Sequence, residues 1–300
     1  MSPMSVPRLP RVELGASIPR VLHQTFPSRT LPIAFQENVG RLRELHPNWD
    51  YRFYDDDDIV QYIRTHYGEE IFAYFTRIDP RYGAARADIF RYLLMYREGG
   101  VYLDIKSAAR GPLDEVLRSD DQYVLSYWRG SQFSGWGDYS ELREYGGREF
   151  QQWHIITAPG HPYLKSVVEI VLRNIENYTP LTWGVGRKGV MRVTGPVAYT
   201  RAIGLIRSKY PHRLVNGQDE LLLDYTTLSD VYHRSLFQFH YTVLRDPVVL
   251  LEGRKKITWI LLGPFYKHGV LLGERIVAAI LRRINKVFLF LGGKPLRPSK

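Results

Sequence analysis

The segment Ala84–Lys106 constrains the fold of this chain most, because it joins a helix to a strand through two glycines. Its apolar side chains recur at the i, i+3, i+4, i+7 spacing of one helical face, at Ile89, Tyr92, Leu93 and Tyr96. Gly99-Gly100 then ends the helix, and a strand begins at Val101. A helix and a strand joined so closely are typical of an α/β protein.

Strand patterns and helix patterns interleave along the remaining chain. The expected strands are Ile18–Phe26, Asp50–Tyr54, Tyr123–Tyr127, Trp153–Ala158 and Phe237–Leu244. The expected helices are Gln36–Leu45, Ile59–His66, Leu164–Ile175 and Val197–Ser208. This order predicts an α/β fold with a single open mixed sheet and helices on both faces.

The geometry of the helix and the strand brings four charged residues close together. A strand climbs about 13 Å to Asp104 at roughly 3.3 Å per residue, and the preceding helix covers that distance in about nine residues. Asp88 and Arg91 share one helical face, and Asp104 and Lys106 share one strand face. If the faces meet, two carboxylates and two cations converge where open α/β sheets bind ligands. From these residues alone, a structural cluster of ion pairs is an equally good interpretation.

The two motifs together resemble the signature of glycosyltransferase family 32, a group of DXD sugar transferases. They are ARADIFRY at Ala85–Tyr92 and GGVYLD at Gly99–Asp104. Ile18–Phe26 is similar to the first strand of that family, and Tyr51–Ile59 to a later segment. The resemblance implies a GT-A (Rossmann-like) fold and retaining transfer of a hexose from UDP or GDP. The acceptor would be a saccharide or lipid-linked, as in surface polysaccharide, capsular polysaccharide or glycoconjugate synthesis.

The resemblance also implies the site residues. Asp88 and Arg91 are expected to contact the donor sugar and hold its diphosphate, and Asp104 to bind the ribose or a Mn²⁺ or Mg²⁺ ion. His23 and Gln24 are expected near the nucleotide base. His240, in a late strand, is expected to make a further contact with the diphosphate or a metal.

Lys106 departs from the family pattern, because it stands where the family has its second aspartate. A lysine cannot bind the divalent cation, but its ammonium group can stabilise the charge that develops on the leaving diphosphate. We therefore expect transfer that needs little or no metal, with Lys106 and Arg91 as fixed cations.

Three alternatives remain open at this point. Another carboxylate could supply the missing metal ligand, from Asp138, Asp219 or Glu220. The chain could instead be a catalytically inactive nucleotide-sugar-binding protein with a degenerate DXD motif. A hydrolase with Asp88 and Asp104 as its acid–base pair is disfavoured, because the neighbouring cations are expected to keep both carboxylates ionised.

The net charge of +10 is concentrated near the C-terminus. Residues 254–300 hold eleven Lys and Arg against one acidic residue, so the preceding chain is neutral and a nucleic-acid-binding surface is disfavoured. Over Arg275–Leu291, apolar side chains form one helical stripe with cations largely opposite. This pattern predicts a helix at an anionic membrane surface, although packing of the same stripe on the domain explains it equally well.

The expected organisation follows from these features. We expect a disordered leader at residues 1–17, a GT-A catalytic domain at 18–250, and a basic amphipathic segment at 251–300 that contacts the membrane peripherally. There is no cysteine, so neither a disulfide nor a thiolate metal site can form. The sequence shows no signal peptide and no apolar run of about 18 residues. The expected location is therefore cytoplasmic, peripheral on the inner face of the membrane.

Overall fold

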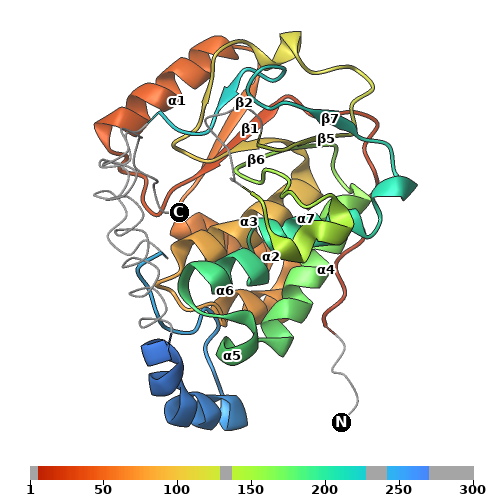
Figure 1. The fold of residues 1–300 in the computed structure, drawn as a ribbon. Helices are drawn as coiled ribbons and strands as arrows, with labels where there is room; N and C mark the ends of the chain where they lie inside the picture. The colour runs from red at the N-terminus through yellow and green to blue at the C-terminus, as the bar shows by residue number, and fades with distance from the viewer. Residues whose placement is uncertain (1–5, 129–136, 228–241, 270–300) are drawn as a thin grey trace, which may run out of the picture.

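The computed structural model describes residues 6–128, 137–227 and 242–269 (Figure 1). Its strands are β1 (Val21–Thr25), β2 (Asp50–Tyr54), β3 (Gly100–Leu103), β4 (Ala108–Ala109), β5 (Tyr123–Ser126), β6 (His154–Thr157), β7 (Arg213–Val215) and β8 (Leu223–Asp224). Its helices are α1 (Ile33–Leu45), α2 (Asp56–Thr76), α3 (Gly83–Glu98), α4 (Pro162–Asn177), α5 (Pro180–Trp183), α6 (Gly186–Val193) and α7 (Pro196–Gly204). Three short 3-10 helices connect them, η1 (Leu113–Glu115), η3 (Ser140–Tyr145) and η4 (Arg207–Lys209).

Six of these strands form one open mixed sheet in the order β2-β1-β3-β6-β5-β7. Strand β1 runs parallel to β2 and β3, and β5 runs parallel to β7. Strand β6 is antiparallel to both of its neighbours, β3 and β5. The remaining strands, β4 and β8, pair antiparallel in a separate two-stranded sheet. The predicted α/β class with an open mixed main sheet is confirmed.

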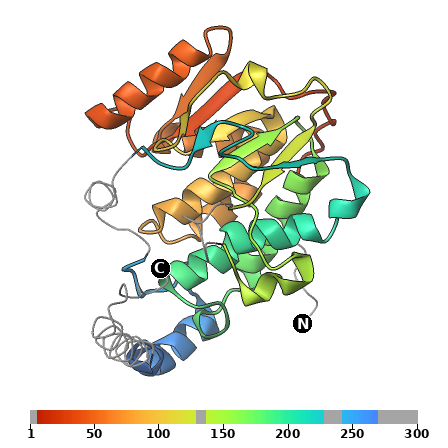
Figure 2. The same ribbon diagram turned by 45° about the horizontal axis from the view of Figure 1, so that its top comes forward.

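The sheet lies between two unequal layers of helices. In Figures 1 and 2, α1 covers one face, and α2, α3, α4, α6 and α7 cover the other. Side chains alternate between these layers along each strand. In β3, Tyr102 belongs to the core under the larger group of helices, whereas Val101 and Leu103 belong to the core on the α1 side. Helices on both faces were predicted and are confirmed.

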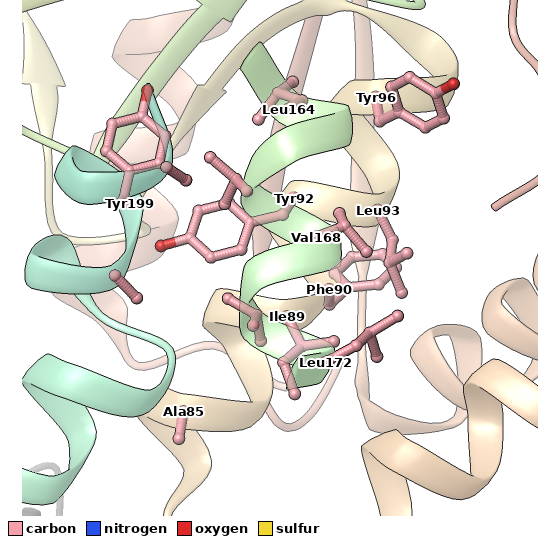
Figure 3. Close-up of a cluster of buried hydrophobic side chains, with 14 of the residues drawn as sticks. Ala85, Ile89, Phe90, Tyr92, Leu93, Tyr96, Leu164, Val168, Leu172 and Tyr199 are labelled. Carbon is pink, nitrogen blue, oxygen red and sulfur yellow. The ribbon is translucent and has the colours of Figure 1, made fainter. Parts of the chain in front are cut away.

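Helix α3 lies at the centre of the larger core (Figure 3). Ile89 and Leu93 on α3 are buried against the apolar side chains of α4. Tyr92 stacks on Tyr199 of α7, with ring centroids 5.6 Å apart and an interplanar angle of 12°. Each buried side chain of this size contributes roughly 1.5–3 kcal/mol. Helix α3 is thus held on several sides, and so are the polar residues that it presents to the sheet.

The turn between α3 and β3 depends on its two glycines, because both adopt positive φ, +65° at Gly99 and +91° at Gly100. A Cβ atom added at Gly100 would lie 2.6 Å from the backbone oxygen of Val21 on β1. The backbone of β3 therefore approaches β1 more closely than any side chain would allow.

We expect Gly100→Ala to lower the free energy of unfolding by about 3 kcal/mol, from backbone strain together with the clash on β1. Gly40→Ala, in α1, is the matched control, since a Cβ there meets nothing within 4 Å. It should be neutral or stabilise the protein by up to about 1 kcal/mol. Urea unfolding of both variants tests the prediction, which fails if the two variants have equal effects.

The predicted disordered leader is wrong for residues 6–17, and residues 1–5 lie outside the described chain. Val6, Leu9 and Val12 pack against the larger core. The backbone N–H of Val12 donates to the hydroxyl of Tyr96 at 3.4 Å. Apolar residues spaced between the prolines therefore fix this segment along α3, although it forms no regular structure.

Other predicted elements differ at their ends. Helix α2 begins at Asp56, three residues before the predicted start, with a capping box between Asp55 and Asp58, and it continues past a kink at Gly68 to Thr76. Helix α7 ends at Gly204 instead of the predicted residue 208. Of the predicted strand at 237–244, residues 237–241 lie outside the described chain and 242–244 are not in a strand. Among the described residues no helix is both long and apolar enough to cross a membrane.

Candidate functional site

The candidate site lies where β3 ends, directly beside the middle of α3. A guanidinium nitrogen of Arg91 (Nη1) is 3.0 Å from Oδ1 of Asp104, and Nη2 is 3.5 Å from Oδ1 of Asp88. The side chains of Asp88 and Arg91 are only 4% and 6% exposed, whereas that of Asp104 is 22% exposed. The structure thus brings these three predicted residues together, with Asp104 on the solvent side.

A buried hydrogen-bond network holds Asp88 and Arg91 in place. The side-chain amide of Gln152 donates to Oδ1 of Asp88 at 3.1 Å, and the hydroxyl of Thr194 donates to Oδ2 at 2.9 Å. Arg91 donates to the backbone oxygen of Gln152 at 2.9 Å. The hydroxyl of Tyr92 is within hydrogen-bond distance of two acceptors, the backbone oxygen of Thr194, at 2.8 Å, and the side-chain oxygen of Gln152. Both oxygens of Asp88 are therefore occupied by protein donors.

The charges in this network follow from its burial. Burial raises the pKa of Asp88, although Arg91 and the two hydrogen bonds oppose the rise. Burial alone would lower the pKa of Arg91, but Asp104 and the other neighbours raise it, so Arg91 stays charged. Arg91 thus acts on Asp88 in the expected direction, but burial outweighs it, so the net pKa of Asp88 is raised. A hydrolytic role for Asp88 is disfavoured instead by geometry, because the group is buried with both oxygens bonded.

Lys106 lies beside this cluster but does not join it directly. Its ammonium group donates to the hydroxyl of Tyr225 at 2.7 Å. Burial lowers the pKa of Lys106, and Arg91 lowers it further, while Asp104 raises it. Among the described residues Lys106 forms no ion pair. One of its three N–H groups is used by Tyr225, which leaves donors for an anionic ligand.

Gln24 and His23, at the end of β1, have different surroundings. The side-chain amide of Gln24 donates to the backbone oxygen of Asp104 at 3.3 Å, and Gln24 accepts from the hydroxyl of Tyr51 at 3.0 Å. His23 is fully buried, with Nε2 3.1 Å from the backbone oxygen of Gly99 and Nδ1 3.3 Å from the hydroxyl of Tyr54. Burial lowers the pKa of His23 to about 4. Gln24 thus adjoins Asp104, while His23 is placed as a core residue.

The described residues do not fit a divalent cation. Asp104 is already paired with Arg91, and Lys106, two residues further on, lies in the turn that follows β3 and is a lysine, not the carboxylate expected on the same strand face. The other carboxylates considered from the sequence have partners of their own: Arg148 for Asp138, and Asn216 for Asp219 and Glu220. Within the described ranges, no group of three or more His, Asp or Glu side chains could hold a metal ion. His240 lies outside those ranges.

Glu149 is a buried carboxyl group that the sequence analysis did not single out. Its Oε1 accepts from the indole N–H of Trp128 at 2.7 Å, and its Oε2 has no hydrogen-bond partner in the described structure. Trp128 packs edge-on against Tyr225, which holds Lys106, so Glu149 is linked to the site through two aromatic rings. Burial raises the pKa of Glu149 from its ordinary value of 4.5 to about 7.

This shift predicts a pH-dependent stability. The unfolded chain releases the Glu149 proton near pH 4.5 and the folded chain near pH 7, so folding loses stability as the pH rises between them. Glu149→Gln keeps an acceptor for Trp128 and removes the buried charge. We expect its stability relative to the unmodified chain to increase by roughly 2 kcal/mol between pH 5 and pH 8. Urea unfolding at both pH values measures this, and a pH-independent difference would contradict it.

Comparison with known proteins identifies the region that carries the site. Residues 32–123 match the family described as glycosyltransferase sugar-binding region containing DXD motif. The matched residues include Asp88, Arg91, Asp104 and Lys106, so the resemblance drawn from the sequence is confirmed.

Curated relatives of this chain are mannosyltransferases. Inositol phosphoceramide mannosyltransferase 2 of Schizosaccharomyces pombe is 25% identical over 268 residues, which cover 85% of this chain and 66% of that protein. Inositol phosphoceramide mannosyltransferase 3 of the same yeast is 27% identical, over 55% of this chain and 40% of the relative. Its initiation-specific alpha-1,6-mannosyltransferase is 26% identical, over 64% of this chain and 49% of the relative. The chain thus spans between 40% and 66% of the length of these relatives.

Two solved structures are also similar. The PaToxG glycosyltransferase is 15% identical with a TM-score of 0.43, covering 80% of this chain and 83% of that one. The UDP-bound glycosyltransferase domain of the YGT toxin is 10% identical with a TM-score of 0.42, covering 71% of this chain and 82% of that one.

Proposed function

We propose that this chain transfers a hexose from a UDP- or GDP-sugar to a saccharide or lipid-linked acceptor, on a GT-A fold and with retention of configuration. The observation that carries the proposal is the guanidinium of Arg91, held between Asp88 and Asp104 at the end of β3. This cluster lies in the region that matches a glycosyltransferase sugar-binding family. Because the relatives are mannosyltransferases, we place mannose first among the hexoses.

The proposed roles of the site residues follow from their charge and their exposure to solvent. Arg91 is rigidly held by its ion pairs, and we assign to it a fixed positive charge that would stabilise the diphosphate of a donor. Lys106, with free donors beside Tyr225, adds a second cation. Both stabilise the negative charge that develops on the leaving nucleoside diphosphate, without any reorganisation during the reaction. Asp104, the most exposed carboxylate of the cluster, would accept a hydrogen bond from a hydroxyl of the donor ribose or sugar.

Asp88 has a supporting role in this proposal. Its two oxygens are bound by Gln152 and Thr194, so it cannot approach a sugar carbon as a nucleophile without losing both hydrogen bonds. We therefore assign to Asp88 the orientation of Arg91. This assignment departs from the direct contact with the donor sugar that the family resemblance implies.

The setting of the reaction is also a proposal. Two of the relatives are named for inositol phosphoceramide, a lipid, which favours a lipid-linked acceptor over a capsular polysaccharide. A cytoplasmic location and peripheral membrane contact through residues 254–300 agree with such an acceptor. The predicted interfacial stripe at 275–291 lies outside the described residues.

Release of nucleoside diphosphate from a panel of UDP- and GDP-sugars tests the proposal. We expect turnover of one donor, with Asp104→Asn at least a hundredfold slower. An inactive nucleotide-sugar-binding protein would give donor binding by calorimetry but no release with any acceptor tested. Release that is unaffected by Asp104→Asn would show that the chemistry occurs elsewhere.

A further inference from the structure

Residues 253–269 form a helix with an unusually apolar surface. Five of the eleven exposed large hydrophobic side chains of the described structure lie on it, within nine residues of sequence. Their exposed fractions are 60% at Ile257, 62% at Ile260, 63% at Leu261, 46% at Leu262 and 77% at Phe265. Isolated exposed apolar residues are ordinary on a protein surface, but a contiguous group of this size indicates an interaction surface.

The apolar stripe faces away from the other parts of the chain that the structure describes. The least exposed positions on the helix are Lys255, Trp259, Gly263, Tyr266 and Lys267, which recur at helical spacing on one side. On that side Lys255 donates to the backbone oxygen of Glu176 at 2.6 Å, and Lys267 pairs with Asp246 at 2.7 Å. Ile257, Leu261 and Phe265 follow each other at i, i+4, i+8 on the opposite side.

Figures 1 and 2 show where this helix lies in the molecule. In both views the helix, coloured blue, lies at the lower left edge of the molecule, on the far side from α1 and the sheet. Its inner side is anchored to the body by the two lysine contacts, so the outer side is presented at a fixed angle. Among the described residues, the stripe therefore lies on the outer side of an anchored helix.

The charges around the stripe indicate which kind of partner binds to it. Arg254 and Lys256 are exposed at the first turn of the helix, and residues 254–300 together carry a net charge of +10. A second copy of this surface would add further positive charge, whereas anionic lipid headgroups would neutralise these cations. A helix with an apolar stripe flanked by cations is the type that lies in the plane of an anionic membrane interface.

We propose that the helix at 253–269 docks on an anionic membrane surface, with Ile257, Ile260, Leu261 and Phe265 inserted among the lipids. The docking does not depend on whether the chain transfers sugar. It would hold the domain at the surface where a lipid-linked acceptor is found. The proposal also places the membrane contact N-terminal to the amphipathic segment that the sequence predicts at 275–291.

Sedimentation of the full chain with vesicles tests the docking. We expect binding to vesicles of phosphatidylcholine with phosphatidylglycerol, and at least tenfold weaker binding to phosphatidylcholine alone. Leu261→Glu combined with Phe265→Glu should weaken binding to the anionic vesicles at least tenfold. Both positions are exposed, so the melting temperature should not change. Leu205→Glu is the matched control, because Leu205 is 58% exposed but lies after α7, and it should bind like the unmodified chain.

Three results would overturn the proposal. The unmodified chain could fail to bind anionic vesicles, or the double variant could bind them as tightly as the unmodified chain does. Alternatively, size exclusion without lipid could show that the unmodified chain is a dimer and the double variant a monomer. That last result would make the stripe an interface between two copies.

Discussion

Replacing Arg91 by alanine is expected to slow nucleotide release at least a thousandfold and to lower the free energy of unfolding by about 3–5 kcal/mol. The variant removes the cation that would face the diphosphate. It also leaves Asp88 buried without its ion-pair partner, a carboxylate that is only 4% exposed. Initial rates with a saturating donor and urea unfolding measure the two effects separately.

Arg91→Lys distinguishes charge from geometry. A lysine keeps the positive charge but cannot reach Asp88, Asp104 and the backbone oxygen of Gln152 together, as the guanidinium does. We expect it to recover most of the stability but to remain at least tenfold slower than the unmodified chain. A variant Arg91→Ala that is as stable and as fast as the unmodified chain would show that the cluster is neither structural nor catalytic.

Replacing Lys106 by aspartate is expected to convert the chain from metal-independent to metal-dependent turnover. The variant supplies the second aspartate of the family pattern, two residues after Asp104, so that two carboxylates can bind Mn²⁺. In EDTA its rate should fall by about a hundredfold or more, because a fixed cation has been replaced by an anion. Added Mn²⁺ should restore a substantial part of that loss.

Lys106→Ala is the matched control for this prediction. It removes the cation without adding a metal ligand, so its rate should fall in EDTA and should not recover with Mn²⁺. Equal recovery of both variants would show that the metal is bound by other residues. A Lys106→Ala variant with an unchanged rate in EDTA would show that Lys106 does not act on the leaving group.

The part of the site that could be predicted is the part encoded locally. Asp88, Arg91 and Asp104 lie within seventeen residues of sequence, and the two glycines before Asp104 allow the strand to fold back along the helix. Helical and strand periodicities then decide which side chains face each other. The ion pairs of Arg91 follow from that geometry.

The residues that support the site could not be predicted in the same way. Gln152, Thr194 and Tyr225 come from later segments, and each is positioned by tertiary packing that leaves no periodic signal in the sequence. Glu149 was missed for the same reason, since only the structure shows that its carboxyl group is buried. The sequence does indicate that such supporting residues exist, because a helix that carries both Asp88 and Arg91 on a buried face needs polar partners for them.

At residues 6–17 and at His23, the structure differs from what the sequence suggested for the same physical reason. Composition suggested a disordered leader, but three apolar side chains between prolines are enough to fix an extended segment against a large core. His23 was placed near the nucleotide base by resemblance, but its ring is enclosed by Tyr54 and the turn at Gly99. In both cases the position of the residues depends on which surface of the folded core is left uncovered by other elements. The order of residues in the sequence does not show this.

The initial rate of nucleotide release by the unmodified chain, in EDTA and in Mn²⁺, tests the central claim most directly. The donor is the one selected from the panel of UDP- and GDP-sugars. If Arg91 and Lys106 serve as the fixed cations of the site, the rate in EDTA should be within about threefold of the rate with Mn²⁺. A rate that is lost in EDTA and restored by Mn²⁺ would contradict that account and would require a metal site built from other residues.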